Sequence, residues 1–150
     1  MDDEVFEKAR RAVLEMKESI PKAIKETINR EVEVLRRLQT ESQLFKGKNS
    51  EGDRIVPLYK PLTIKIKKEK GDPWDRVTLA DTGEFYDTLI IEGYDDYYKI
   101  EFSPTLEYGR KLIEKYGSNV LGIQQELIED FVRTFVADNL KKNWNDILAR

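Results

Sequence analysis

Apolar residues recur at helical spacing at both ends of the chain and at strand spacing only in its middle. The longest helical pattern runs from Gln124 to Leu148. Its apolar stripe is wide, so we expect one helix that is packed along most of its length. The stripe consists of Ile128, Phe131, Val132, Phe135, Val136, Leu140, Trp144 and Ile147.

The first 45 residues have the same periodicity, except that Pro21 interrupts it. Proline is tolerated in the first turn of a helix and disfavoured in its interior. The pattern therefore predicts two amphipathic helices, with Ser19 as the cap of the second. The second helix packs either on the core or on a partner helix in a ring. The apolar positions are Val5, Ala9, Ala12, Val13 and Met16 in the first helix, and Ile24, Ile28, Val32, Leu35 and Leu38 in the second.

A β-hairpin is predicted near residues 85–102. The segment 85–92 is rich in β-branched and aromatic residues, residues 93–96 form a turn, and apolar and polar residues alternate through 97–102. A lone hairpin is only marginally stable. We therefore expect further strands, around Ile55-Val56, around Val77–Leu79, or from a neighbouring subunit.

The order of helices, hairpin and helices predicts an α+β fold. Long amphipathic N- and C-terminal helices would pack on a small antiparallel sheet. After the hairpin, Ser103 and Pro104 predict the start of a short helix that ends at Gly117.

Two turn-rich segments, 46–62 and 71–76, are expected to project from this single domain of residues 1–150. Residues 61–70 alternate like a strand, but they also fit a short lysine-rich helix that stops at Gly71. We favour the helix.

The chain contains neither histidine nor cysteine. It therefore lacks the usual general base near neutral pH, the commonest metal ligands and any disulfide. We expect no enzymatic activity, no cofactor and no metal site. The acidic start Met1–Glu4 has no apolar core behind it, and no apolar run approaches the roughly 18 residues of a membrane span.

Charge is unevenly distributed along the chain. Lys60–Lys70 contains five lysines and one glutamate, a balance of +4, whereas Asp81–Glu101 contains seven acids and one lysine, a balance of −6. Such patches suit head-to-tail contact between identical subunits, or are simply two solvated surfaces. A nucleic-acid-binding module that uses Lys65, Lys67 and Lys68 is an alternative, which the net charge of −3 argues against.

Two acidic motifs suggest other functions. Asp81-Thr82-Gly83 matches the catalytic tripeptide of retroviral-type aspartic proteases, but Glu84 and the long helices do not suit that fold. We interpret the tripeptide as a structural turn, in which Asp81 accepts backbone hydrogen bonds and Gly83 permits a tight bend into a strand. A divalent-cation cluster without calcium-loop spacing is the second possibility. It would consist of Glu92, Asp95, Asp96 and Glu101.

Short motifs spread over about 90 residues carry a resemblance to a known group of proteins. They are Leu38-Gln39, Leu44-Phe45-Lys46-Gly47, Gly52, Tyr59-Lys60-Pro61, Lys70-Gly71-Asp72-Pro73, Arg76-Val77-Thr78-Leu79, Asp81-Thr82-Gly83-Glu84-Phe85-Tyr86, Lys115-Tyr116-Gly117 and Gly122-Ile123. Together they resemble small virion proteins of bacteriophages that infect Bacteroidetes. More loosely, a Thr-Gly turn after a long N-terminal helix is similar to tail-completion (neck) proteins of tailed phages.

The resemblance implies a structural, non-enzymatic ring subunit between the head connector and the tail. Its partners would be further copies of itself and the portal, connector and tail proteins. Its location would be the virion, assembled in the host cytoplasm, with no membrane contact and no nucleic acid except DNA passing through the lumen. A minor tail or portal-ring protein is the alternative.

We expect the ring contacts to involve the basic stretch and its neighbouring loops. Trp74 and Tyr59 would be the apolar anchors of such an interface, because their loops are too polar to belong clearly to the core. For Trp74 the alternative is an indole that folds back onto the core. The full candidate set is Tyr59, Lys60, Lys65, Lys67, Lys68, Trp74 and Arg76.

Overall fold

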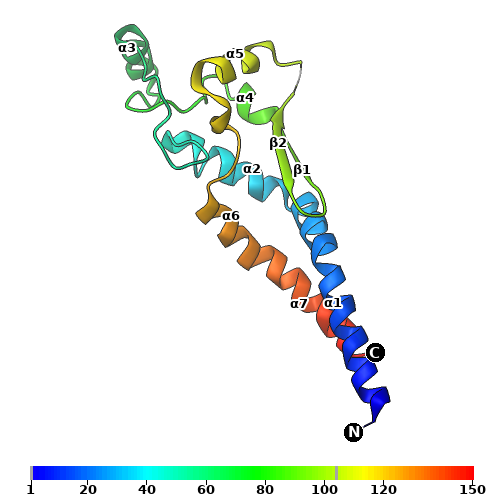
Figure 1. Cartoon of the computed structure of the whole chain (residues 1–150). Helices are drawn as coiled ribbons and strands as arrows, with labels where there is room; N and C mark the ends of the chain where they lie inside the picture. Colours follow the sequence, from blue (N-terminus) through cyan, green and yellow to red (C-terminus); the bar gives the residue numbers. More distant parts are fainter. Residues whose placement is uncertain (1, 104) are drawn as a thin grey trace.

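The computed structural model describes residues 2–103 and 105–150. It confirms the α+β class, with helices around one antiparallel hairpin. An arm of long helices extends from a head that holds the shorter elements (Figure 1). In chain order the elements are α1 (Asp3–Arg30), α2 (Val32–Thr40), η1 (Leu44–Lys46), α3 (Pro61–Lys70), α4 (Glu84–Asp87), β1 (Leu89–Gly93), β2 (Tyr98–Phe102), α5 (Glu107–Tyr116), η2 (Ser118–Val120), α6 (Gln125–Phe131), η3 (Val132–Val136) and α7 (Ala137–Leu148).

The predicted break at Pro21 is wrong, because α1 continues through the proline. Ser19 caps no helix; its hydroxyl donates to the Met16 carbonyl, 2.5 Å away. An interior proline removes one backbone hydrogen bond, and packing against α7 on both sides of it keeps the helix intact. The chain changes direction instead at Glu31, whose φ of −103° and ψ of 31° lie outside the helical region.

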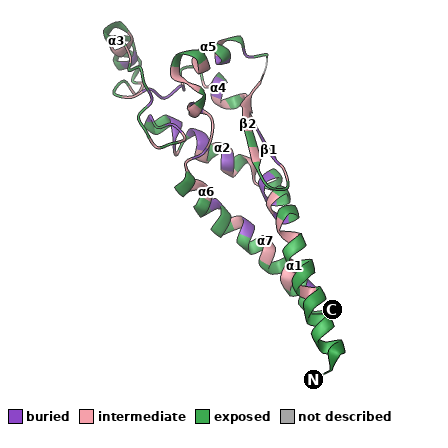
Figure 2. Ribbon diagram, viewed as in Figure 1, coloured by how far each residue is buried: buried purple, intermediate pink, exposed green. Residues whose placement is uncertain are grey.

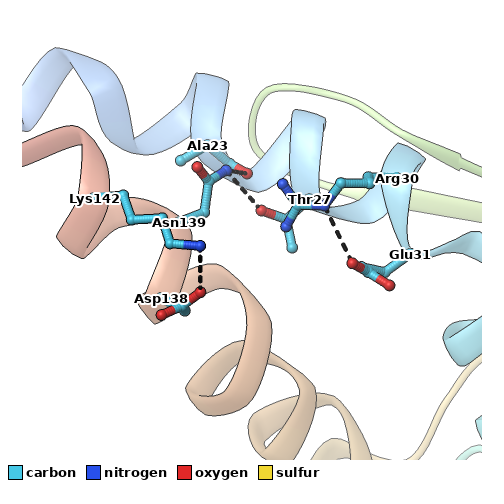
Figure 3. A network of polar contacts seen from close by, with 7 residues as sticks. All are labelled: Ala23, Thr27, Arg30, Glu31, Asp138, Asn139 and Lys142. Atoms are coloured by element: carbon cyan, nitrogen blue, oxygen red, sulfur yellow. Dashed lines mark hydrogen bonds and ion pairs between the residues drawn. The ribbon is translucent and has the colours of Figure 1, made fainter.

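The predicted C-terminal helix is confirmed as α6, η3 and α7, which follow one another without a break. η3 is a π-helical stretch, and α7 pairs with α1 to form the arm. Figure 3 shows how the two helices are joined: the Asn139 side-chain amide donates to the Thr27 hydroxyl (3.0 Å) and to the Ala23 carbonyl (3.4 Å). Ala23 is fully buried, and its small side chain permits this close approach.

The hairpin is shorter than predicted. β1 begins only at Leu89, since residues 84–87 form α4, and Leu89 lies opposite Phe102. The additional strands expected at 55–56 and 77–79 are not formed, and β1 and β2 are the only strands in the described part of the chain. Support for the hairpin comes instead from α1 and α2, which lie against it.

Gly93 sets the contact between the hairpin and α1. Its N–H donates to Asn29 Oδ1 (2.8 Å), and Asn29 Nδ2 donates back to its carbonyl (3.3 Å). A Cβ at this position would lie 2.8 Å from Ile28 Cβ, closer than side chains approach. Only glycine fits here without displacing the helix.

Two apolar clusters form the core, and Figure 2 shows them concentrated in the head and the upper arm. The head cluster contains Leu44, Ile55, Val77, Leu79, Phe85, Leu89, Leu106 and Val120. The arm cluster contains Ile28, Leu35, Ile91, Ile123, Phe131 and Val136.

Two fully buried glutamines, one in α2 and one between α2 and η1, bond the segment that leads into α6. Gln39 Nε2 donates to the Val120 carbonyl (3.0 Å), and its Oε1 accepts the Gly122 N–H (2.9 Å). Gln43 repeats the pattern, donating to the Gly122 carbonyl (2.7 Å) and accepting the Gln124 N–H (2.7 Å). Gln39 lies in α2 and Gln43 lies just beyond its end, and together the two side chains pair with backbone groups of residues 120–124.

Of the two short helices predicted in the head, α3 has the predicted bounds and α5 begins later than predicted. α3 begins at Pro61 and ends at Gly71, which adopts the left-handed conformation with φ of 75°. α5 ends before Gly117, as predicted, but it begins only at Glu107. Ser103 does not cap this helix, because its hydroxyl bonds the Thr105 hydroxyl (2.8 Å) instead. The predicted role of Pro104 lies outside the described residues. Among the helices described, none is long and apolar enough to cross a membrane.

Candidate assembly surface

α3 is the most prominent feature of the head. It stands at the end of the molecule opposite the arm (Figure 1), and most of its surface is exposed (Figure 2). Its apolar residues are not confined to one inner face, because Leu62 is 70% exposed and Ile66 is also exposed. A short helix with exposed apolar and basic side chains is typical of a surface that contacts another protein.

The lysines of the basic stretch fall into two groups. Lys60, Lys65, Lys68 and Lys70 are exposed, as an interface requires. Lys67 differs, since it is only 7% exposed and its ammonium lies 4.8 Å from the centre of the Tyr59 ring. Lys67 therefore faces inwards, and the expectation that it forms part of an open basic surface is wrong.

Tyr59 is half-buried and links the segment before α3 to the segment around Thr78. Its hydroxyl accepts the N–H of Thr78 (3.1 Å), while the Tyr86 hydroxyl donates to the Thr78 carbonyl. Burial, with a smaller effect from neighbouring Tyr59, raises the pKa of Tyr86 well above that of a free tyrosine. The structure thus places Tyr59 at the inner edge of the candidate surface.

Trp74 is 45% exposed, on the loop that follows α3. The Lys68 ammonium lies 4.0 Å from the centre of its ring, within the range of a cation–π contact. A cavity of about 280 Å³ opens beside it, with Leu58 and Ile64 in its wall. An exposed indole at the edge of an apolar hollow is a typical interface anchor, and Trp74 is the best placed of the predicted residues.

Arg76 is engaged within the head. Its Nε donates to the Phe45 carbonyl (2.7 Å), and its guanidinium pairs with Asp75 (2.8 Å). The guanidinium also lies 5.4 Å from the Phe45 ring centre. Gly47 approaches the stem of this side chain so closely that a Cβ there would be 2.8 Å from Arg76 Cβ. Arg76 therefore joins two loops rather than presenting a free cation.

A second cavity, of about 420 Å³, lies between α3 and α5. Four lysines line it, together with Asp81 as the only carboxylate of its wall. Lys115 contributes from α5, and its ammonium lies 5.1 Å from the Tyr116 ring centre. The lysines are Lys60, Lys67, Lys70 and Lys115. This cavity extends the positive surface around the inner side of α3.

The Asp81-Thr82-Gly83 turn has a different role from the one predicted. Gly83 has φ of 78° and precedes the short helix α4, not a strand. The Thr82 hydroxyl, rather than the Asp81 carboxylate, accepts the N–H of Glu84 (3.3 Å). Asp81 is exposed at the rim of the lysine-lined cavity.

Four acids of the negative stretch, Glu92, Asp95, Asp96 and Glu101, belong to the hairpin, which lies away from α3 in Figure 1. Glu92 accepts a hydrogen bond from the Tyr94 hydroxyl (2.9 Å), and Glu101 pairs with Lys99 (2.9 Å). Within residues 2–103 and 105–150 no three potential ligands lie close enough to hold a metal, so the alternative of a divalent-cation cluster finds no support. At the tip, Asp95 and the adjacent acid Asp96 are exposed.

Sequence reasoning missed the apolar component of this surface. Leu62 and Ile66 are four residues apart, which places them on one side of a helix, and this spacing within a lysine run was the available signal. No protein-family model, curated protein or solved structure matches the chain.

Proposed function

We propose that the chain is a structural, non-enzymatic component of a tailed-phage virion. It would form a ring as a neck or tail-completion subunit that joins the portal or connector to the tail. A minor tail or portal-ring protein is the alternative. The observation that carries the proposal is the separation of two surfaces of opposite charge, one on α3 and one on the hairpin.

The two surfaces suit a head-to-tail contact between copies. In each copy the exposed lysines of α3 and the exposed acids of the hairpin tip lie at different places on the molecule, so neither can neutralise the other internally (Figure 1). A contact between different patches of identical subunits is heterologous, and it closes into a ring when the rotation per subunit divides a full turn. Opposite charges would fix the orientation of the subunits.

The apolar residues beside the lysines would supply most of the affinity. Trp74, Leu62 and Ile66 are exposed around the basic side chains. Buried aromatic and aliphatic anchors dominate binding energies, whereas exposed ion pairs contribute little. The surface thus combines an apolar centre with charged residues around it.

A charge-swap experiment tests the contact. Lys65→Glu with Lys68→Glu should abolish self-assembly, as should Asp95→Lys with Asp96→Lys, and mixing the two variants should restore it through the swapped pair. Light scattering and electron microscopy of the purified protein provide the measurement. Lys17→Glu with Lys22→Glu, on the exposed face of the arm, is the matched control and should assemble normally. Unaltered assembly of both swapped variants would exclude these surfaces.

Membership of a virion is tested separately. We expect the neighbouring genes to encode portal, capsid and tail proteins, and mass spectrometry of purified particles to detect the chain. A variant with Trp74→Ala and two reversed lysines should fold but be missing from particles. Particles that lack the unaltered protein would refute the assignment.

A further inference from the structure

The side of α3 that faces α5 is lined with lysines. Four polar residues in or directly before α3 follow one another at spacings of three and four positions, which places them on one side of the helix. They are Lys60, Thr63, Lys67 and Lys70, and all four line the cavity of about 420 Å³ between α3 and α5. Lys65 belongs to the opposite side of the helix and is not part of the wall. The inner lysines are therefore a group separate from the outer ones.

Lys67 carries a buried charge that no other charge balances. The residue is only 7% exposed, and its ammonium lies 4.8 Å from the centre of the Tyr59 ring. Among residues 2–103 and 105–150 it has no ion-pair partner and no hydrogen-bond acceptor. The same residues include no side-chain nitrogen that is both sealed from solvent and unpaired, so the ammonium reaches open space. Tyr59 lines the cavity between α3 and α5 but not the hollow of about 70 Å³ that Lys67 also borders. Because a buried cation costs free energy unless an anion pairs with it, the cavity is suited to an anion.

A second lysine faces the same space from α5. The Lys115 ammonium lies 5.1 Å from the centre of the Tyr116 ring, and both residues line the cavity. Each wall thus holds an ammonium near a tyrosine ring, Lys67 on one side and Lys115 on the other. A ring face orients an ammonium but does not neutralise its charge, so the ammonium remains able to donate to a ligand. Asp81 is the only carboxylate of the wall, and four lysines against one acid give the wall a formal charge of +3.

We propose that this cavity binds a small molecule that carries two or more phosphate groups, of the class of a nucleoside di- or triphosphate. The lysines are spread along the whole of α3, about 15 Å from Lys60 to Lys70, so an anion with a single charged group would reach only part of them. Lysine is a common phosphate ligand that acts as a point charge, whereas carboxylates suit the fork of an arginine, and no arginine lines the cavity. Its volume of about 420 Å³ lies within the usual range of small-molecule sites.

An adjoining hollow of about 300 Å³ has room for the uncharged part of such a ligand. It shares Leu79, Asp81 and Leu112 with the lysine-lined cavity and adds Tyr108. Leu79, which borders both spaces, has φ of 57° and is the one residue other than glycine with a positive φ among those described. Such strained residues are concentrated at binding sites. An aromatic base beside Tyr108 and a phosphate chain among the lysines would use both spaces.

Isothermal titration calorimetry of the full chain with ATP tests the site, at about 0.15 M salt and without divalent cations. We expect saturable binding of one ATP per chain. Lys67→Met should weaken binding about tenfold or more, because a charge-assisted hydrogen bond is lost. Lys115→Met should have a similar effect, and since Lys115 is exposed this variant should keep the fold. Asp81→Asn should strengthen binding, because it removes the one negative charge of the wall.

Controls separate this site from the proposed ring contact. Lys65→Met changes an exposed lysine of the same helix outside the cavity wall, and its ATP affinity should stay within about twofold of the unaltered protein. The variant with Asp95→Lys and Asp96→Lys should lose assembly but bind ATP normally. Lys115→Met should lose ATP binding but assemble normally. Failure of the ring contact and failure of the phosphate site can therefore be distinguished.

Inorganic tripolyphosphate and citrate test the chemistry of the ligand. Tripolyphosphate should bind more weakly than ATP because it lacks the nucleoside, and citrate should bind more weakly still because it carries carboxylates. Binding of either as tight as that of ATP would overturn the assigned class. Equal losses of ATP affinity from Lys65→Met and Lys115→Met would show a diffuse basic surface of the kind that nucleic acid contacts, and would also overturn the proposal. The absence of saturable ATP binding would do the same.

Discussion

Gln39→Leu offers the sharpest test of how the head is joined to the arm. The side chain is fully buried and makes two hydrogen bonds, to the Val120 carbonyl and from the Gly122 N–H. Leucine fills nearly the same space but leaves both backbone groups without their partner. Each buried group that loses its partner costs about 1–3 kcal/mol. Added apolar contact offsets part of this cost, so we expect a net loss of about 2–4 kcal/mol in the free energy of unfolding.

Thermal unfolding followed by circular dichroism measures this effect. For a chain of this size, about 1 kcal/mol corresponds to a shift in Tm of roughly 2–4 °C, so the Tm should fall by about 4–16 °C. Gln125→Leu is the matched control, because Gln125 is exposed and bonds only the neighbouring Glu129 carboxylate. Its effect should stay within about 0.5 kcal/mol. Equal shifts for the two variants, or an unchanged Tm for Gln39→Leu, would refute the reasoning.

Three further predictions concern single positions. Gly93→Ala should destabilise the protein by about 1–3 kcal/mol in urea unfolding, since the new Cβ would lie 2.8 Å from Ile28 Cβ; an unchanged midpoint would contradict the packing argument. Gly83→Val should cost about 1–3 kcal/mol through backbone strain alone, because φ is 78° and a Cβ at this position would have no neighbouring atom within 4 Å, and Gly83→Asn should cost less. Burial raises the pKa of Tyr86, so the folded state retains this proton at pH values where the unfolded chain releases it. Unfolding free energy should therefore fall as the pH rises above about 10, and Tyr86→Phe should reduce that slope.

Local sequence patterns predicted the regular elements well where the pattern was long or clearly bounded. The C-terminal helix is one continuous rod as its stripe indicated, and α3 lies between the proline and the glycine that delimit it. The hairpin was located correctly, but its first strand was predicted four residues too early. Phe85 and Tyr86 have high strand propensity, yet they form a helical turn after Gly83.

The candidate surface was predicted only in part, for reasons that involve contacts distant in sequence. The outer lysines are exposed as expected, and Trp74, whose exposure the sequence left open, is also exposed. In the sequence, Lys67 and Arg76 are not distinguishable from the exposed basic residues near them. In the structure, the Lys67 ammonium lies over the Tyr59 ring and Arg76 bonds the Phe45 carbonyl. A lysine run does not reveal which of its members faces inwards when the helix has apolar residues on several sides.

The sequence by itself determined the α+β class, the helical ends of the chain and the separation of its positive and negative segments, because these depend on periodicity and charge along the chain. The tertiary structure alone decided that α1 passes through Pro21, since packing against α7 compensates for the lost backbone bond. It also decided that the hairpin needs no third strand, because α1 and α2 lie against it and the Asn29 side chain bonds Gly93. Both outcomes depend on residues more than 60 positions apart, whose proximity no local pattern encodes.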